Sequence, residues 1–273
     1  MKKLRLALLI MSPILFFISC GNDDDSLIPE EIITQLASTT YNLSAASDLD
    51  VEGFVTFIKN SNDTTTLYIE LSGDINTAKH PAQLRLNTAA ETGAVVLELE
   101  AINIETGISS TTTNALTYEE LIAFDGYVNV QNSNFESDGL LVQGDIGQND
   151  LTTTSITYDL LEQDVMDASG SVTFTKRVNG EALAVISLNG APSGGVHPAH
   201  IHSNDAATTG PIIFTFNTVN GTAGISKTNV STLNDGTPFL YDDVLTVNGY
   251  INVHLSESQL SVLLAQGNIG SNI

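Results

Sequence analysis

Three histidines have spacings that suit a metal site built from nitrogen ligands. Residues 197–202 read HPAHIH, and His254 closes the segment YINVH. In an extended segment His200 and His202 point to one face, while Ile201 points to the other. Neutral imidazoles are common ligands of zinc and copper, so His200, His202 and His254 are candidate ligands.

The orientation of these side chains follows from the apolar residues beside them. In the second segment Ile251 and Val253 share one face of a strand, and His254 lies on the opposite face. If Ile201, Ile251 and Val253 face the core, the three imidazoles project from the outer face of the sheet. An earlier segment of the chain, residues 80–85, repeats the pattern of residues 197–202 and has Arg85 in place of His202. Because a buried arginine is costly, we expect this face of the sheet to be exposed to water. Exposed histidines that bind nothing are the alternative interpretation.

The chain carries the same pattern twice, and the first copy lacks the three candidate ligands. HPAQLR at residues 80–85 returns as HPAHIH, and GYVNVQ at residues 126–131 returns as GYINVH. At the positions of the three candidate ligands, the first copy has Gln83, Arg85 and Gln131 where the second has His200, His202 and His254. A shared role of the three histidines predicts that a copy lacks all three together. The alternative is that a repeated copy accumulates substitutions at any position exposed to water. His80 and His197 occur in both copies, which favours a structural hydrogen bond in the proline-containing turn.

Alternating polar and apolar residues predict that strands position these side chains. The alternation runs through residues 53–57, 67–71, 94–99 and 127–130, and again through residues 171–175, 183–188, 212–216 and 250–253. Each copy also holds one short helical turn, and Thr117 to Glu120 has a capping-box pattern. We therefore predict an all-β fold with two tandem antiparallel Greek-key sandwich or barrel domains. These domains cover residues 38–149 and 155–273, and a threonine-rich linker spans residues 149–156.

The N-terminal segment is predicted to direct export and lipid attachment. Residues 1–19 combine a basic start with an apolar run too short to span a bilayer comfortably, as in a secretory signal peptide. The sequence FISCG around Cys20 resembles a bacterial lipobox, whose cysteine is lipidated and becomes the mature N-terminus. A plain membrane anchor or a buried cysteine is the alternative. Cys20 is the single cysteine, so no intrachain disulfide can form.

An acidic stretch follows the cysteine directly. Asp23, Asp24 and Asp25 resemble the export signal of Bacteroidota surface lipoproteins, which directs them to the cell surface. The same composition would also suit a solvated spacer. We therefore expect residues 20–37 to form a tether, and the protein to be lipid-anchored at the outer membrane with its folded part displayed outside.

The charge of the chain excludes some classes of partner. It has 9 basic and 32 acidic residues, for a net charge of −23. Cleavage of the signal removes Lys2, Lys3 and Arg5 and no acid, which takes the net charge to −26. Nucleic acid is excluded, because binding to its phosphates requires clustered lysine and arginine. Charged residues make up only 15% of the chain and hydrophobic residues 42%, which favours a folded protein over a disordered one.

The order of motifs in the second copy resembles a known family. Three motifs follow one another along the chain: AHIH at residues 199–202, GPII at residues 210–213 and YINVH at residues 250–254. They resemble the CHRD domain, first described in chordin and widespread in bacterial exported proteins. The resemblance covers about residues 169–270, and residues 52–147 look like a degenerate copy. The closing stretch LAQGNI at residues 264–269 lacks the arginine and glutamate usual in the family. The resemblance implies a β fold and little about activity.

No catalytic arrangement stands out in the sequence. There is no Ser-His-Asp order or nucleophile elbow, and the second copy has too few histidines for a bridged two-metal site. The leading hypothesis is a non-enzymatic surface protein whose two CHRD-like modules bind or display an extracellular protein, a glycan or a metal. The first alternative is zinc or copper binding, or a metal-assisted redox role, in the second copy. The second alternative is a structural spacer in the envelope.

Overall fold

The computed structural model describes residues 32–46, 50–73, 75, 79–132 and 139–273. Residues Ile33–Ile273 form one compact unit. The predicted signal peptide, Cys20, the three aspartates and most of the tether lie outside the described residues, so these predictions stay open. In the described part of the chain, no helix is long and apolar enough to span a membrane.

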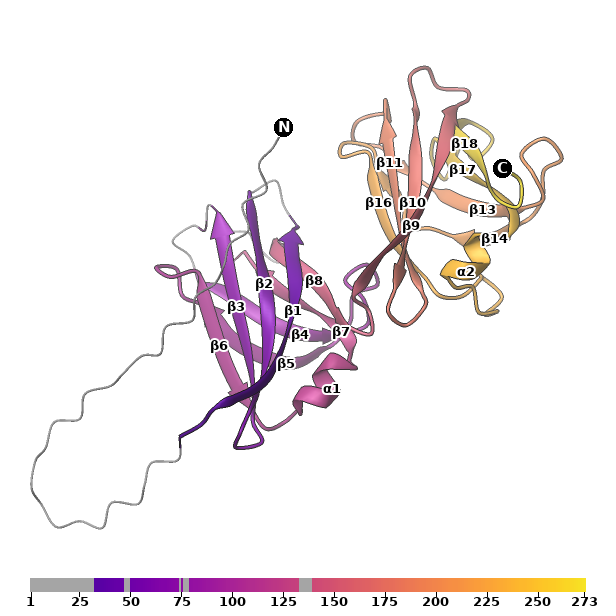
Figure 1. Cartoon of the computed structure of the whole chain (residues 1–273). Helices are drawn as coiled ribbons and strands as arrows, with labels where there is room; N and C mark the ends of the chain where they lie inside the picture. The colour runs from indigo at the N-terminus through magenta and orange to yellow at the C-terminus, as the bar shows by residue number, and fades with distance from the viewer. Residues whose placement is uncertain (1–31, 47–49, 74, 76–78, 133–138) are drawn as a thin grey trace, which may run out of the picture. The chain divides into compact units, whose positions relative to one another are not determined.

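The first copy of the sequence pattern forms an eight-stranded sheet, hereafter the N-terminal sheet (Figure 1). Its strands are β1 (Gln35–Ala45), β2 (Val51–Asn60), β3 (Thr65–Gly73), β4 (His80–Leu86), β5 (Val95–Ile102), β6 (Ile108–Thr113), β7 (Asp125–Gln131) and β8 (Leu140–Gly147). They pair in the order β5-β4-β7-β8-β1-β2-β3-β6. A short helix, α1 (Tyr118–Ile122), begins with the predicted capping box between Thr117 and Glu120.

The second copy forms a ten-stranded sheet, hereafter the C-terminal sheet (Figure 1). Its strands are β9 (Leu151–Glu162), β10 (Ser169–Arg177), β11 (Ala182–Asn189), β12 (Val196–His197), β13 (Ala199–Ser203), β14 (Ile212–Thr215), β15 (Val219–Asn220), β16 (Ile225–Val230), β17 (Asn248–His254) and β18 (Leu263–Gly270). Their order is β12-β15-β16-β11-β10-β9-β18-β17-β13-β14. The second short helix, α2 (Tyr241–Val244), begins with Asp243 accepting a hydrogen bond from the Leu240 amide.

The two sheets share one strand order. Reading from β5, the N-terminal order matches β14-β13-β17-β18-β9-β10-β11-β16 strand for strand, and every pairing in both sheets is antiparallel. The sheets curl into barrel-like and half-barrel shapes, and the described helices are limited to α1 and α2. The all-β prediction is therefore confirmed, with the helical turn of each copy in its expected place.

The predicted linker is the clearest error of the secondary-structure prediction. The sequence predicts a linker at residues 149–156, but β9 begins at Leu151 and pairs with β10. Threonine is branched at Cβ and suits a pleated strand, so a threonine-rich run extends a sheet readily. The hydroxyls of Thr157 and Thr173 lie 2.8 Å apart across that pair. By contrast, Asn179 and Gly180 do lie in the tight connection between β10 and β11, where Gly180 adopts a φ of 89°.

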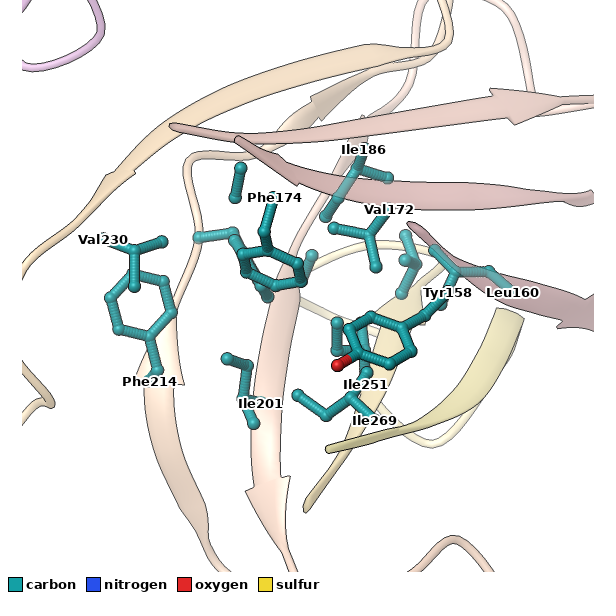
Figure 2. Packing of buried hydrophobic residues seen from close by; sticks show 14 of the residues in the cluster. Tyr158, Leu160, Val172, Phe174, Ile186, Ile201, Phe214, Val230, Ile251 and Ile269 are labelled. Atoms are coloured by element: carbon teal, nitrogen blue, oxygen red, sulfur yellow. The ribbon is translucent and has the colours of Figure 1, made fainter. Parts of the chain in front are cut away.

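A core of apolar side chains fixes the orientation of the C-terminal sheet. Ile201 of β13 and Ile251 of β17 have no exposed surface, and they point into the same cluster as Phe174 and Tyr158 (Figure 2). The rings of Tyr158 and Phe174 meet edge to face at 6.1 Å between centroids. Burying each large apolar side chain stabilises the fold by about 1.5–3 kcal/mol. Because alternate residues point to opposite faces, this packing forces the neighbours of Ile201 and Ile251 away from the core.

Candidate metal centre

The three candidate histidines lie on two neighbouring strands. In the antiparallel pair of β13 and β17, His200 lies opposite Asn252, and His202 lies opposite Tyr250. His254, at the end of β17, donates its backbone amide to the carbonyl of Pro198, which holds that strand end beside β13. The register therefore places His200, His202 and His254 on one face of the sheet, opposite the core.

The three imidazole rings converge. Each histidine offers one ligand nitrogen such that all three atoms lie within 4.8 Å of one another. The ring centroids of His200 and His254 are 5.1 Å apart, those of His200 and His202 6.1 Å, and those of His202 and His254 6.3 Å. Sequence reasoning named these residues from two separate motifs, and the structure brings them into one cluster.

The expectation that this face is wet is wrong. His200 is only 9% exposed and His254 only 6%, while His202 is half-buried. The ring of Tyr250 stacks on His202 at 5.0 Å with an interplanar angle of 20°. The connections after β13 and β17 also reach these rings through backbone carbonyls. Alternation correctly identified the face opposite the core, but it carries no information about the loops that cover that face.

Two backbone carbonyls fix the orientation of two of the rings. Nδ1 of His202 lies 2.8 Å from the carbonyl oxygen of Gly210, and Nδ1 of His254 lies 2.6 Å from that of Leu260. A carbonyl oxygen can only accept, so each Nδ1 carries the proton and donates it. The lone pair of each neutral ring therefore resides on Nε2, the nitrogen that remains available to a metal. Ligating histidines commonly donate their second ring nitrogen in this way.

Each ring has one buried nitrogen without a hydrogen-bond partner within the described structure. These atoms are Nδ1 of His200, Nε2 of His202 and Nε2 of His254, and all three are buried. A buried polar atom left unpaired costs about 1–3 kcal/mol. Unprotonated imidazole nitrogens carry lone pairs that a metal ion can accept. Three unpaired nitrogens in one cluster therefore fit a metal site.

The surroundings of His200 and His254 favour the uncharged form of these two imidazoles. The pKa of His200 is lowered to about 4, first by burial and then by the neighbouring rings of His254 and His202. Burial also lowers the pKa of His254, although the hydrogen bond to Leu260 acts in the opposite direction, and His202 lowers it further. A metal ion competes with protons for these nitrogens, so rings that stay neutral near pH 7 are ready to bind.

The same face of the N-terminal sheet shows what replaces such a cluster. Nε of Arg85 donates to the side-chain oxygen of Gln83 at 3.0 Å, and the amide of Gln131 donates to the same oxygen at 3.3 Å. Arg85 also donates to the carbonyl of Gly93 at 2.7 Å, just as His202 pairs with the aligned Gly210. Gln83 thus bonds to both Arg85 and Gln131, and among the described residues of this face no cluster of metal-ligand atoms is found.

The other two histidines have a different environment. His80 and His197 are 0% and 1% exposed, and neither belongs to the cluster. Nδ1 of His80 lies 3.1 Å from the carbonyl of Gln131, and Nδ1 of His197 lies 2.8 Å from that of Leu255. The ring of His80 thus connects the start of β4 to the end of the neighbouring β7, and the ring of His197, just before β13, contacts the residue that follows β17. The partner is distant in sequence, although Nε2 of His197 also approaches the carbonyl of Pro192 at 3.4 Å within the local turn.

Residues that support the cluster were missed in the sequence. The hydroxyl of Tyr250 accepts a hydrogen bond from the Gly210 amide at 3.2 Å, so the ring that stacks on His202 also holds the loop that orients it. Leu260 contributes only its carbonyl, and no side-chain pattern can reveal such a role. The repetition of Gly93 as Gly210 was the one available signal, because both glycines supply the equivalent carbonyl.

The part of the chain that contains the cluster matches a known domain family. Residues 154–259 match the CHRD domain. The CHRD segment contains His200, His202 and His254, and it runs from within β9 to the connection after β17. The resemblance predicted from three motifs is therefore confirmed for this part of the chain. Comparison of the chain with curated proteins and with solved structures gave no match.

Proposed function

We propose that this protein is a non-enzymatic binding module of the cell envelope whose ligand is a transition-metal ion, zinc or copper. The ion is held by His200, His202 and His254 of the CHRD segment. One observation carries the proposal: each of the three histidines offers a ring nitrogen within 4.8 Å of those of the other two, and each ring also has a buried nitrogen without a hydrogen-bond partner. A binding function needs no catalytic residue, and the CHRD assignment and barrel-like fold are consistent with it.

The three imidazoles form a preorganised set of metal ligands. Two rings are oriented by the carbonyls of Gly210 and Leu260, and burial favours the neutral form of His200 and His254. Imidazole nitrogen suits zinc and copper better than magnesium or calcium, which prefer oxygen ligands. A bound ion would supply a partner for ring nitrogens that now lack one.

We also propose that the fold is held at the outer surface of the cell by lipid on Cys20. The lipobox resemblance and the acidic stretch Asp23 to Asp25 support this location. Several acyl chains on one N-terminus anchor a protein stably, because each buried methylene contributes about 0.8 kcal/mol. The metal site would then face the medium or its neighbours in the envelope and not the cytoplasm.

Metal analysis of the purified full chain tests the binding function. We expect one zinc or copper ion per chain, and loss of that ion in the double variant His200→Gln with His202→Gln. The matched control is Gln83→Ala with Arg85→Ala, which changes the aligned positions of the N-terminal sheet and should leave metal content unchanged. Absence of stoichiometric zinc and copper at micromolar metal would reject the proposal.

The location has a separate test in whole cells. Replacing Asp23, Asp24 and Asp25 by alanine should change the folded part from accessible to protected against added protease. Cys20→Ser should release the protein from the membrane fraction. If protease accessibility is unchanged in the aspartate variant, the acidic stretch is only a spacer.

A further inference from the structure

We infer that the cluster of His200, His202 and His254 prefers monovalent copper over divalent metal ions. This inference rests on the proposed function, since it names the ion that the same site would select. It follows from three features of the cluster: uncharged ligands, burial and the number of ligands that the protein supplies.

The first feature is the charge of the ligand set. Within the described residues, the group contains imidazoles alone and no aspartate or glutamate. A divalent ion bound there keeps two uncompensated positive charges, whereas Cu(I) keeps one. The cost of transferring an ion from water into a medium of low dielectric constant grows with the square of its charge. It is therefore about four times larger for a dication than for a monocation of equal size.

The second feature is the burial of the rings, which makes this cost matter. His200 and His254 are almost fully buried, so an ion held between them is largely removed from water. The acid that influences His254 is Glu257, which lies on the connection after β17 and is exposed to solvent. Water and salt screen an exposed carboxylate, so it compensates a buried dication poorly. The strongly negative net charge of the chain acts through the same screening.

The third feature is the coordination number. Zinc in protein sites almost always takes four ligands in a tetrahedron. Cu(I) has a filled d shell and is stable with two or three ligands. The protein provides three nitrogens within 4.8 Å of one another, so Cu(I) would need no further ligand. A divalent ion would need solvent or an added anion to complete its shell.

Competition experiments on the purified full chain test the preference. The affinity for Cu(I) is measured against bicinchoninate under argon with ascorbate as reductant, that for Cu(II) against glycine in air, and that for Zn(II) against zincon. We expect a dissociation constant for Cu(I) at least about 100-fold below that for Cu(II). Such a ratio places the one-electron reduction potential of the bound copper about 118 mV above that of the unbound copper ion, because each tenfold ratio of the two dissociation constants corresponds to about 59 mV.

A substitution of one ligand gives a second readout. His202 is the half-buried member, so His202→Met should be accommodated by the fold. A thioether is a soft ligand that suits Cu(I) and binds divalent ions weakly. We expect His202→Met to keep Cu(I) affinity within about tenfold and to weaken Cu(II) and Zn(II) binding by more than that. His202→Gln is the matched control, and it should lose affinity for all three ions.

The outcomes separate this inference from the function on which it rests. Stoichiometric Zn(II) or Cu(II) bound as tightly as Cu(I) would overturn the preference and leave the metal-binding function in place. Equal loss of Cu(I) and Cu(II) in His202→Met would also overturn it. Failure to bind any of the three ions would reject both proposals.

Discussion

The ring of His254 is held by the carbonyl oxygen of Leu260, 2.6 Å from Nδ1 and six residues further along the chain. Leu260 is 44% exposed, so its side chain contributes little to the core while its backbone orients a candidate ligand. The connection between β17 and β18 is therefore part of the candidate metal centre, although it contributes no side chain to it.

Loosening this connection should weaken metal binding without unfolding the protein. Leu260→Gly gives the backbone access to more conformations, so the carbonyl should orient His254 less often. Supporting contacts of this kind typically change metal affinity by about 10- to 100-fold, and we expect a loss near the lower end. The measurement is the dissociation constant of the bound metal. Leu260→Ala is the control and should retain the wild-type constant; an unchanged constant in Leu260→Gly would show that the carbonyl contact is dispensable.

Metal binding should stabilise the folded protein. An ion that binds only the native state adds about 2.7 kcal/mol at a free concentration 100 times its dissociation constant. We therefore expect a higher Tm with copper or zinc, and a return to the metal-free value after chelation. His254→Gln should abolish the metal-dependent shift, whereas Gln131→Ala at the aligned position should keep it. A shift that persists in His254→Gln would indicate binding elsewhere.

The metal-free protein should lose stability as the pH falls. The pKa values of His200 and His254 are lower in the folded state, while an unfolded histidine titrates near pH 6.5. Below about pH 6.5 the unfolded chain therefore takes up protons that the folded chain refuses. This loss continues toward pH 4, where folded His200 titrates.

Urea unfolding of chelator-treated protein between about pH 7 and pH 4 measures this dependence. His200→Gln lacks one of the two groups, so its stability should fall less steeply than that of the wild type. Carboxylates are common to both proteins, and their contribution cancels in the comparison. Parallel pH profiles for the two proteins would contradict the prediction.

A second site should be obtainable in the N-terminal sheet. The triple variant Gln83→His, Arg85→His and Gln131→His places imidazoles at the aligned positions of β4 and β7, and the carbonyl of Gly93 already receives a hydrogen bond from residue 85. We expect metal content to rise from one to two ions per chain. The added ion should bind more weakly, because the new residues were not selected with their surroundings. Unchanged metal content in a folded triple variant would show that ligand type and strand position are insufficient.

Periodicity allowed much of the fold to be predicted from the sequence. Each of the eight alternating segments lies within a strand to within one residue, and the orientation of Ile201, Ile251 and Val253 toward the core follows from the same alternation. The error at residues 149–156 arose because threonine suits both exposed connections and strands. Pairing partners decide between the two, and β10 supplies the partner for β9.

The candidate site was only partly predictable. Residue types and alternation identified His200, His202 and His254, but their burial depends on the connections after β13 and β17, which have no periodic pattern. The hydrogen bonds to Gly210 and Leu260 involve carbonyls, which every residue possesses, so the sequence cannot mark them. Three-dimensional structure was needed to show that two rings are fixed and that one nitrogen of each ring lies within 4.8 Å of those of the other two.

The stacking of Tyr250 on His202 gives the protein an intrinsic optical probe. The chain has seven tyrosines and no tryptophan, so its ultraviolet fluorescence arises from phenol groups alone. One of these emitters touches a candidate ligand, and oxidised copper is an efficient quencher at such range, whereas zinc is not. Emission intensity can therefore follow occupancy and oxidation state in real time without an added dye.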